Sequence, residues 1–548
     1  MFTDPVTGNN FYDREEYLDI LLKRAKGLEK GYRQNIALLG EETIGKTSLI
    51  LHFLSKIKED SFRVLPFYLE IDTELTFDYF VKRLISIILF NIIKLNHKTA
   101  PSHNIDELLK HSEDLIPKTI QEVKKCLVHL KNSKFYDAYI TILTVPQSLS
   151  QELGIPVIVI IEEFHRLERF TILHNPFNEL AKTIMVSKDT MYIVTSSSTT
   201  HAKKILSKEL TLLFGNFEII KLEPFDIKTS NNFLEKRLES IKCSAYYRDF
   251  ISEITGGQPL YLNIISEETK ITAIEKKSNF ITDEILIEAI TRILFDSMGI
   301  LNQIFSHRIK EIPTNRSPLS YTSILISLAH KCYKTRNLKE FLDTKSEKEF
   351  INHLNTLIEM NYIDKNGVFY YLNDELFRIW LTEVYESKRS SLDVGLEVKR
   401  ECFKRYLREK LNSFLKNRRK SIVERLHELF ENFGNETVYF GSRKIKLPNF
   451  DNIEIKNAHS RLPILTGKTR DKSWIFVVSK GHLNRDLMEE IDCQCNKLKL
   501  KKERKFVIAL DSVDEDARLI AKETKFITLE NRDLDRILKL YGKYRIFY

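Results

Sequence analysis

The sequence contains few of the residues that build metal clusters or disulfide frameworks, with only six cysteines in 548 residues. Cys493 and Cys495 lie close together, and the other four are isolated, at positions 126, 243, 332 and 402. One C-x-C pair, without a second pair or histidines at ligand spacing, is weak evidence for a metal. We therefore expect buried or free thiols.

Long apolar runs are also missing. The N-terminal residues MFTDPVTGNNFYDREE lack the apolar core of a signal peptide. The most apolar helix-like run, Leu84–Leu95, is too short to cross a bilayer and is interrupted by Ser86 and Asn91. We expect a cytoplasmic protein with no membrane partner.

The composition is that of a folded protein, with 43% hydrophobic and 29% charged residues. At about 150 residues per domain, the length suggests three or four domains. The net charge of +9 is modest for this size, so the distribution of the basic residues matters more than their sum.

The most informative segment is NIALLGEETIGKTSLIL, residues 35–51, which joins a buried apolar run to a glycine loop and a helical pattern. It satisfies G-x-x-x-x-G-K-[ST] through Gly40, Gly45, Lys46 and Thr47. The glycines let consecutive N–H groups face phosphate oxygens, and the helix N-terminus adds positive charge. The alternative is a structural glycine turn, but the strand-loop-helix context favours a nucleotide-binding loop.

The residue types of this loop suggest their roles. Lys46 can neutralise the β- and γ-phosphates, and the Thr47 hydroxyl can ligate Mg²⁺. The predicted nucleotide-binding residues of the loop are Gly40, Glu41, Glu42, Thr43, Ile44, Gly45, Lys46, Thr47 and Ser48.

A second apolar run, Ile155–Leu167, carries two adjacent acids. A continuous β-branched run predicts a central parallel strand, and α/β sheets bind ligands at the carboxyl ends of such strands. We expect Glu162 to hold Mg²⁺ and Glu163 to polarise the attacking water, with Lys46 completing the catalytic group. A solvated acidic strand end is the alternative. Glu162 is one methylene longer than the Asp more common there, so hydrolysis is expected to be slow.

The run Met191–Thr200 predicts another buried strand, which ends in hydroxyl groups. Thr195 or Ser196 is the candidate sensor of the γ-phosphate, although serines can also simply end a strand. With strands expected near residues 36, 64, 157, 191 and 217, alternating with helices, the pattern predicts a doubly wound parallel sheet. Residues 96–150 read as helical insertions.

Taken together, these residues resemble the archaeal-type ATPases of the AAA+/STAND group, in particular those similar to origin initiators. The resemblance also rests on Phe11, Arg14 and Glu15, similar to an F-x-x-R-E motif, and on the motif Gly256-Gly257-Gln258-Pro259. It covers roughly the first 300 residues. It implies that Phe11 and Arg14 lie near the adenine and that Pro259 belongs to a helical lid over the nucleotide.

The chain departs from that family where an arginine finger is often found. The segment Leu213-Phe214-Gly215-Asn216 has Asn216 where many relatives have arginine. A missing guanidinium withdraws stabilisation of transition-state charge, which is worth roughly 10³-fold in rate where such fingers act. Lys203 or Lys204 could substitute.

Residues 318–385 predict three helices and a hairpin around Asn366-Gly367, the pattern of a winged helix. Its third helix has few basic residues, so DNA reading and protein docking both remain open. Residues 391–420 are more basic and are the best nucleic-acid candidate of the chain, with a solvated surface as the alternative. The residues selected are Arg400, Lys404, Arg405, Arg408, Arg418, Arg419 and Lys420.

The last 120 or so residues weakly resemble a restriction-endonuclease-like domain. Such nucleases need D/E-x-K at a strand end to hold a metal, but Val478 stands two residues before Lys480. Glu454-Ile455-Lys456 matches D/E-x-K, but the segment before it is less apolar than the strand before Lys480. Glu428 is a candidate for the upstream acid. We expect this domain to be inactive as a nuclease and to serve in binding or assembly.

The sequence thus predicts an α/β multidomain protein. The expected parts are a P-loop ATPase core (1–223), a helical lid (224–312), a winged helix (313–388), a basic linker (389–422) and a nuclease-like α/β domain (423–548). The expected function is an ATP-hydrolysing switch that couples nucleotide state to DNA binding or to assembly with itself or another protein. The alternatives are an ATP-regulated nuclease and a signalling or scaffold ATPase acting on proteins only.

Overall fold

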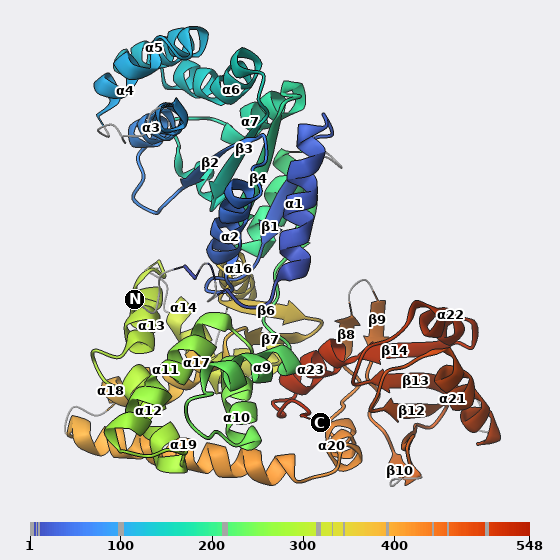
Figure 1. Ribbon diagram of the computed structural model, residues 1–548. Coiled ribbons are helices and arrows are strands. Elements are labelled where there is room, and N and C mark those ends of the chain that lie inside the picture. The colour runs from blue at the N-terminus through green and yellow to red at the C-terminus, as the bar shows by residue number, and fades with distance from the viewer. Residues whose placement is uncertain are drawn as a thin grey trace. The chain divides into compact units, whose positions relative to one another are not determined.

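The computed structural model divides into two compact units, the first made of residues 1–224 with 258–260 and 359–361, and the second of the remainder (Figure 1). The structure describes residues 5–6, 8, 11–96, 104–210, 217–313, 319–330, 333–342, 346–390, 394–440, 443–456, 460–498 and 503–547. None of the helices within these ranges is both long enough and apolar enough to cross a membrane.

The first unit is built on a five-stranded parallel sheet with the strand order β2-β3-β4-β1-β5. The predicted α/β core with a parallel sheet is therefore confirmed. Because all five strands run the same way, their carboxyl ends share one edge, where the phosphate loop also begins. The strands are β1 (Asn35–Leu39), β2 (Leu65–Glu70), β3 (Val157–Glu162), β4 (Thr190–Ser196) and β5 (Phe217–Lys221).

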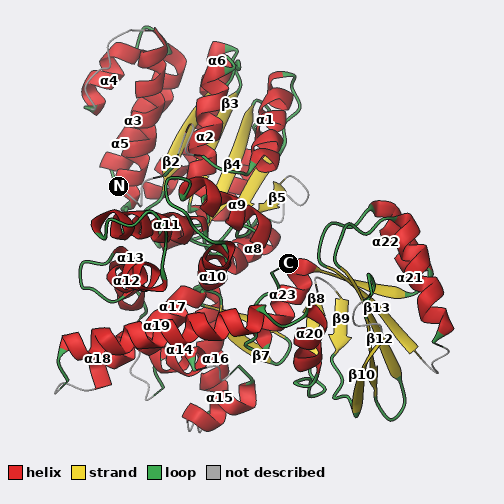
Figure 2. Ribbon diagram, turned by 60° about the horizontal axis from the view of Figure 1, so that its bottom comes forward, coloured by secondary structure: helices red, strands yellow, loops and turns green. Residues whose placement is uncertain are grey.

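Helices cover both faces of this sheet, as Figure 2 shows. On one face, α1 (Glu15–Glu29) and α2 (Lys46–Glu59) pack against side chains such as Ile36 and Ile160. Alternate residues of the same strands pack on the other face with α3 (Phe77–Asn96), α6 (Phe135–Leu153) and α7 (Pro176–Val186). Two further helices, α4 (Ile105–Ser112) and α5 (Pro117–Lys131), pack on α3 and α6.

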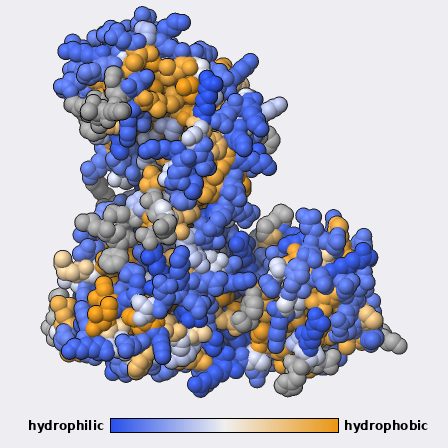
Figure 3. Space-filling view, viewed as in Figure 1, coloured by the Kyte–Doolittle hydropathy of each residue, from blue (hydrophilic) through white to orange (hydrophobic). Residues whose placement is uncertain are grey.

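The sequence placed helical insertions over residues 96–150, and α4, α5 and most of α6 lie there. Part of the surface here is apolar, since Val128 and Tyr136 of the insertions and Leu95 at the end of α3 are exposed. Figure 3 shows a hydrophobic area near the top of the view, over these helices, on a face that is otherwise mostly hydrophilic. The strand predicted to end at the acidic pair is confirmed, because β3 ends at Glu162, and a 3-10 helix, Phe164–Arg169, follows.

The second unit begins with helices, as predicted for residues 224–297. They are α9 (Ile227–Arg237), α10 (Ala245–Thr255), α11 (Pro259–Glu275, whose first two residues belong to the first unit), α12 (Asp283–Leu294) and α13 (Ile300–Lys310). Gly256 ends α10 in the left-handed conformation and Pro259 begins α11, so the Gly-Gly-Gln-Pro motif forms a helix junction.

Three helices and a hairpin follow in the predicted order. They are α14 (Tyr321–Ala329), α15 (Thr335–Leu342), α16 (Glu347–Glu359), β6 (Ile363–Asn366) and β7 (Phe369–Leu372). A short helix, α17 (Glu375–Ile379), continues through a π-helical stretch (Trp380–Glu386) into α18 (Ser387–Ser390), and α19 (Leu396–Arg418) is the long helix of this unit.

The chain ends in a mixed five-stranded sheet with the order β10-β11-β12-β13-β14. Its strands are β10 (Asn452–Lys456), β11 (Ile464–Lys468), β12 (Ser473–Ser479), β13 (Glu503–Ala509) and β14 (Phe526–Glu530). The first three are antiparallel and the last three parallel. The helices are α20 (Ile422–Phe430), α21 (Arg485–Lys497), α22 (Glu515–Glu523) and α23 (Asn531–Leu540).

Two features of this part differ from what the sequence pattern indicates. The segment Val438–Leu447 has the pattern of one strand, but the chain forms a separate hairpin there, β8 (Thr437–Phe440) with β9 (Arg443–Lys446). The sequence did not predict β11 (ILTGK), because it is short and its apolar and polar residues do not alternate. The segment of β10 (NIEIK) alternates, but it is short and contains only two apolar residues.

The β6–β7 hairpin is joined to this last part of the chain. The side-chain amide of Asn366 donates to the carbonyl oxygen of Tyr439 (3.0 Å) and accepts from its main-chain N–H (2.7 Å). Phe369 packs in the same apolar core as Trp474 and contacts the ring of Tyr541 at 5.4 Å between centroids. The hairpin is therefore partly covered by residues 437–541.

Candidate nucleotide-binding site

The glycine loop connects the carboxyl end of β1 to the N-terminus of α2. Gly45 caps the helix at φ 94°, a conformation that only glycine adopts without strain. A Cβ at Gly40 would lie 3.0 Å from both Ile44 Cγ2 and the carbonyl oxygen of Leu222, so close packing also favours glycine there. The local sequence thus produces a tight loop at a helix N-terminus.

Lys46 is the first residue of α2, and its side chain is buried. Its ammonium donates to the carbonyl oxygens of Gly40 (2.9 Å) and Glu41 (3.0 Å) and lies 3.8 Å from Glu163 Oε1. Burial lowers the pKa of Lys46, and the carboxylates of Glu163 and Glu42 act in the opposite direction. The ammonium is thus surrounded by oxygen atoms at the place where the loop would receive phosphates.

Glu162 is the last residue of β3, and only 3% of it is exposed. The Thr47 hydroxyl donates to its Oε1, and the Tyr68 hydroxyl donates to its Oε2. Burial raises the pKa of Glu162, while these two hydrogen bonds act to lower it. Thr47 and Glu162, the predicted metal ligands, are therefore in direct contact.

These two residues fit a magnesium ion chemically. Hydroxyl and carboxylate oxygens are hard donors, and Mg²⁺ in phosphate sites commonly uses one or two protein oxygens together with water and phosphate. Thr47 and Glu162 would supply the protein share. Glu41 and Glu42 add further negative charge around Lys46, so a cation would also reduce repulsion of a nucleotide.

Glu163 directly follows β3 and has φ 56°, an uncommon conformation for a residue with a side chain. Its Oε2 accepts from the main-chain N–H of Ser197 (2.9 Å) and from the Ser197 hydroxyl (2.8 Å). Burial alone would raise the pKa of Glu163, but the ammonium of Lys46 and the Ser197 N–H outweigh burial and lower it. The carboxylate is therefore held ionised.

The predicted sensors lie beside this carboxylate. The Thr195 hydroxyl accepts from the main-chain N–H of Glu163 at 3.3 Å. The Ser196 hydroxyl lies 3.0 Å from Nδ1 of His165, which in turn is 3.3 Å from Glu163 Oε2. Burial lowers the pKa of His165 to about 4, so its ring is neutral at pH 7.

The N-terminal residues pack around the same loop. The ring of Phe11 stacks on His52 of α2 with 4.3 Å between centroids and 9° between planes. The guanidinium of Arg14 donates to the carbonyl oxygen of Glu223 at 2.6 Å. Ser48 accepts from the main-chain N–H of Val6 at 3.0 Å. The first residues of the chain thus follow one side of α2.

Pro259 is the first residue of α11 and belongs to the first unit with its neighbour Gln258. The Gln258 side chain donates to Glu41 Oε2 at 2.9 Å. The candidate finger position, Asn216, lies outside the described residues. Lys203 and Lys204, its suggested substitutes, are exposed at the end of α8 (Thr199–Lys204).

The basic residues of α19 do not form one continuous exposed group. Arg400 donates to Glu288 and Asp296, with two contacts of 2.8 Å, and Lys404 contacts Glu288 at 3.1 Å. Arg418 pairs with Asp249, and Lys420 pairs with Glu428. Arg405, Arg408 and Arg419 are exposed. Four of the seven predicted nucleic-acid residues are therefore engaged in ion pairs, and the other three lie on the exposed surface.

The nuclease-motif candidates are separated in the terminal sheet. Val478 is fully buried in its apolar core, and the exposed Lys480 follows the end of β12. Glu454 on β10 pairs with Lys468 at 3.2 Å. Glu428 is bound by Lys420. Among the described residues, no group of three or more Asp, Glu, His or Cys side chains could hold a metal ion.

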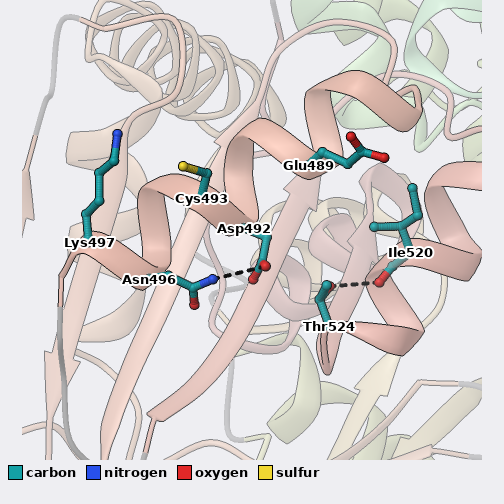
Figure 4. Close-up of a pocket in the computed structure, with 7 residues that line it drawn as sticks. All are labelled: Glu489, Asp492, Cys493, Asn496, Lys497, Ile520 and Thr524. Atoms are coloured by element: carbon teal, nitrogen blue, oxygen red, sulfur yellow. Dashed lines mark hydrogen bonds between the residues drawn. The ribbon is translucent and has the colours of Figure 1, made fainter.

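A cavity of ≈ 570 Å³ lies between α21 and α22 of the terminal sheet. Figure 4 shows its lining, in which Asn496 bonds Asp492 and the Thr524 hydroxyl bonds the carbonyl oxygen of Ile520. Lys505 also contacts Asp492 at 3.0 Å. The acids of the cavity are thus partly neutralised, and no residue of the glycine loop contributes to it.

The sequence did not identify Tyr68, Ser197 or His165. Tyr68 lies on β2 and Ser197 directly follows β4, and only the sheet order brings these two strands next to β3. His165 had a weak signal, since it lies two residues after Glu163.

Residues 11–265 match the family described as an ATPase domain predominantly from Archaea. The matched segment includes the glycine loop, Glu162, Glu163 and Pro259. The chain therefore carries an ATPase domain of the archaeal type, with the nucleotide binding that this implies, as the sequence predicted.

Several solved structures are similar to this chain. The Walker-type ATPase PABY2304 of Pyrococcus abyssi is 19% identical, with 70% of this chain and 99% of that one covered and a TM-score of 0.47. ORC2 of Aeropyrum pernix, in ADPNP–ADP complexes, is 11% identical over 75% and 98%, with a TM-score of 0.44. Cdc6p of Pyrobaculum aerophilum is 11% identical over 75% and 98%, with a TM-score of 0.37. No curated protein matches the chain.

Proposed function

We propose that the chain is an ATP-dependent molecular switch of the AAA+/STAND type. In this proposal residues 1–223 bind and hydrolyse ATP, and the lid (224–312), winged helix (313–388), basic linker (389–422) and terminal domain (423–548) respond to nucleotide state. The observation that carries the proposal is the convergence of four groups at one sheet edge. Lys46 lies 3.8 Å from Glu163, and Thr47 donates to Glu162.

Each of these groups has a distinct task. The N–H groups of the loop and the N-terminus of α2 attract the phosphates. The Lys46 ammonium must leave the carbonyl oxygens of Gly40 and Glu41 to reach a phosphate oxygen. Thr47 and Glu162 would hold Mg²⁺, which adds positive charge beside the β- and γ-phosphates when bound.

Glu163 is the proposed general base. Its ionised carboxylate accepts a proton from water, and the water oxygen forms a bond to the γ-phosphorus. The bond from the γ-phosphorus to the bridging oxygen breaks, and ADP leaves with that electron pair. The present contact of Glu163 Oε2 with Ser197 leaves Oε1, the oxygen nearer Lys46, as the one available to water.

Two substitutions separate these tasks. Lys46→Ala should lose nucleotide affinity, because the buried ammonium is removed. Glu163→Gln should keep nucleotide affinity and lose turnover, because an amide cannot accept the proton. ATPase rate and equilibrium binding of a fluorescent ATP analogue measure the two effects. Native turnover in both variants would contradict the proposal.

DNA is the proposed partner, and the exposed face of α19 supports it. At 100° per residue, positions 405, 408, 416 and 419 fall within about 80° of the helix circumference. Arg405, Arg408, Lys416 and Arg419 are all exposed. A row of cations on one side of a helix suits phosphates spaced along a backbone.

Charge reversal tests this partner. The double variant Arg408→Glu/Arg419→Glu should weaken DNA binding and flatten its dependence on salt, because fewer counterions are released. Arg470→Glu/Lys472→Glu, which changes the net charge equally at another exposed place, is the matched control. Equal loss in both variants would show that only net charge matters.

The two other functions make different predictions. A nuclease would cut DNA in the presence of a divalent metal and lose this activity in Lys480→Ala or Glu454→Ala. A scaffold ATPase acting on proteins alone would hydrolyse ATP but show no salt-sensitive DNA binding.

A further inference from the structure

One carboxylate at the candidate site accepts hydrogen bonds from two hydroxyl groups on two different elements. Thr47, at the start of α2, donates to Oε1 of Glu162, and Tyr68, on β2, donates to Oε2. Thr47 belongs to the glycine loop motif, but no motif includes Tyr68.

The sheet explains why a tyrosine at position 68 reaches this carboxylate. In the parallel pairing of β2 with β3, Tyr68 lies opposite Ile160 and Glu70 lies opposite Glu162. Because side chains alternate along a strand, Tyr68 and Glu162 lie on the same sheet face and are diagonal neighbours, within reach of an aromatic side chain. That face is covered by α2, the helix that carries Thr47.

Glu162 needs more restraint than an aspartate would. Its extra methylene adds a rotatable bond, so the carboxylate has more orientations that miss Thr47. The Tyr68 side chain is half-buried against the apolar cluster between the sheet and α2, which limits its own movement. Its hydroxyl can therefore hold the Glu162 carboxylate in one orientation. With Oε2 held by Tyr68, Oε1 is directed at Thr47.

We propose that Tyr68 is a positioning residue for the magnesium site, holding the Glu162 carboxylate so that its other oxygen, together with Thr47, faces the cation. This inference rests on the proposed function. Tyr68 does not touch the cation or the nucleotide in this role. It acts on the geometry of one metal-binding carboxylate.

A purely structural role predicts different behaviour. If the phenol only satisfied a buried carboxylate, its loss would lower stability without a specific change in magnesium dependence. If it positions Glu162, its loss should change the Mg²⁺ concentration needed for nucleotide binding, while binding without a divalent cation stays the same. Groups that orient metal ligands typically contribute about 10-fold or more to metal affinity.

The test compares the native chain with Tyr68→Phe in equilibrium titrations of a fluorescent ATP analogue at increasing Mg²⁺, and in EDTA. We expect the Mg²⁺ midpoint to rise roughly 10-fold in Tyr68→Phe, with affinity in EDTA changed less than about 2-fold. Tyr139→Phe is the matched control, because its buried hydroxyl donates to the carbonyl oxygen of Pro176 in the same unit (3.0 Å).

A double-mutant cycle adds a second readout. In a Glu162→Ala background, Tyr68→Phe should have no further effect on the midpoint, since its partner is gone. An unchanged midpoint in Tyr68→Phe, an equal shift in Tyr139→Phe, or a full additional shift in the Glu162→Ala background would each overturn this inference alone. A native chain that binds no ATP analogue at any Mg²⁺ concentration would overturn the proposed function, and this inference with it.

Discussion

Ser197 donates two hydrogen bonds to one oxygen of Glu163, from its main-chain nitrogen at 2.9 Å and from its hydroxyl at 2.8 Å. The proposed base is therefore bound by the residue that follows β4, a strand that pairs directly with β3. The pair fixes the orientation of the carboxylate and favours its ionised form. A change at Ser197 should therefore alter the acid–base behaviour of the site.

Ser197→Ala should shift the acid limb of the kcat profile to higher pH. Hydrogen bonds to the ionised form lower the pKa of Glu163, so removal of the hydroxyl raises it. The base acts when ionised, so activity is lost as pH falls through this pKa, and the loss should begin roughly half a unit to one unit higher. Ser148→Ala, whose hydroxyl bonds Glu122 at 2.8 Å, is the matched control. Coincident profiles would contradict the assignment of Glu163 as the base.

Gly367→Ala should destabilise the second unit. The residue has φ 63°, and a Cβ would lie 1.7 Å from the carbonyl oxygen of Thr437, so the hairpin would have to move away from β8. Gly256→Ala is the control, since φ is 62° with nothing within 4 Å of the added Cβ. In both variants the positive φ at an alanine should lower the free energy of unfolding by about 1 kcal/mol. At Gly367 the steric overlap should lower it by about 1–3 kcal/mol more.

Urea unfolding followed by tryptophan fluorescence measures this difference. The two tryptophans of the chain, Trp380 and Trp474, both lie in the second unit. Equal loss of stability in the two glycine variants would show that the hairpin is not held against β8 in solution.

Asp535→Asn should stabilise the second unit above pH 7. Burial raises the pKa of Asp535 to about 7, with Arg545 acting to lower it and Glu253 to raise it. The folded state therefore binds a proton that the unfolded state releases near pH 4, so native stability should fall as pH rises from about 5 to 8. In the variant this fall should be smaller. Unfolding curves of both proteins at pH 5 and pH 8 measure this change in stability, and Asp516→Asn, at an exposed position, is the control. A larger loss of stability with pH in Asp535→Asn than in the native chain would contradict the prediction.

Arg400→Gln should lower the stability of the second unit by about 1 kcal/mol at pH 7. Burial alone would raise the pKa of Glu288, but the hydrogen bonds from Arg400 and Lys404 lower it to about 2. Glu288 is partly exposed to solvent, which limits the size of the effect. The contribution is present above about pH 4.5 and is lost as pH falls towards 2. Arg408→Gln, on the exposed side of α19, should change stability by less than about 0.5 kcal/mol; equal losses would argue against the ion pair.

The local features of the site could be predicted from the sequence. The glycine loop is defined by four residues within eight positions, and the apolar run before Glu162 and Glu163 identifies a buried strand end. Both depend on neighbours in the chain, whose conformations follow from backbone freedom, apolar patterning and helix capping. The turn at Asn366-Gly367 was predictable for the same reason, because it needs only a residue that accepts a positive φ.

The side chains that hold these groups could not be identified from the sequence, because they lie on, or directly after, other strands of the sheet. Tyr68 and Ser197 reach Glu162 and Glu163 because β2 and β4 lie on either side of β3, although they are 94 and 34 residues away in sequence. The same is true of Arg400, whose partners lie more than a hundred positions earlier. The periodicity of apolar residues shows which face of a helix or strand is buried, but not which other element covers that face. The sequence therefore determined the chemistry of the glycine loop, and the order of the strands determined which residues hold Glu162 and Glu163 in place.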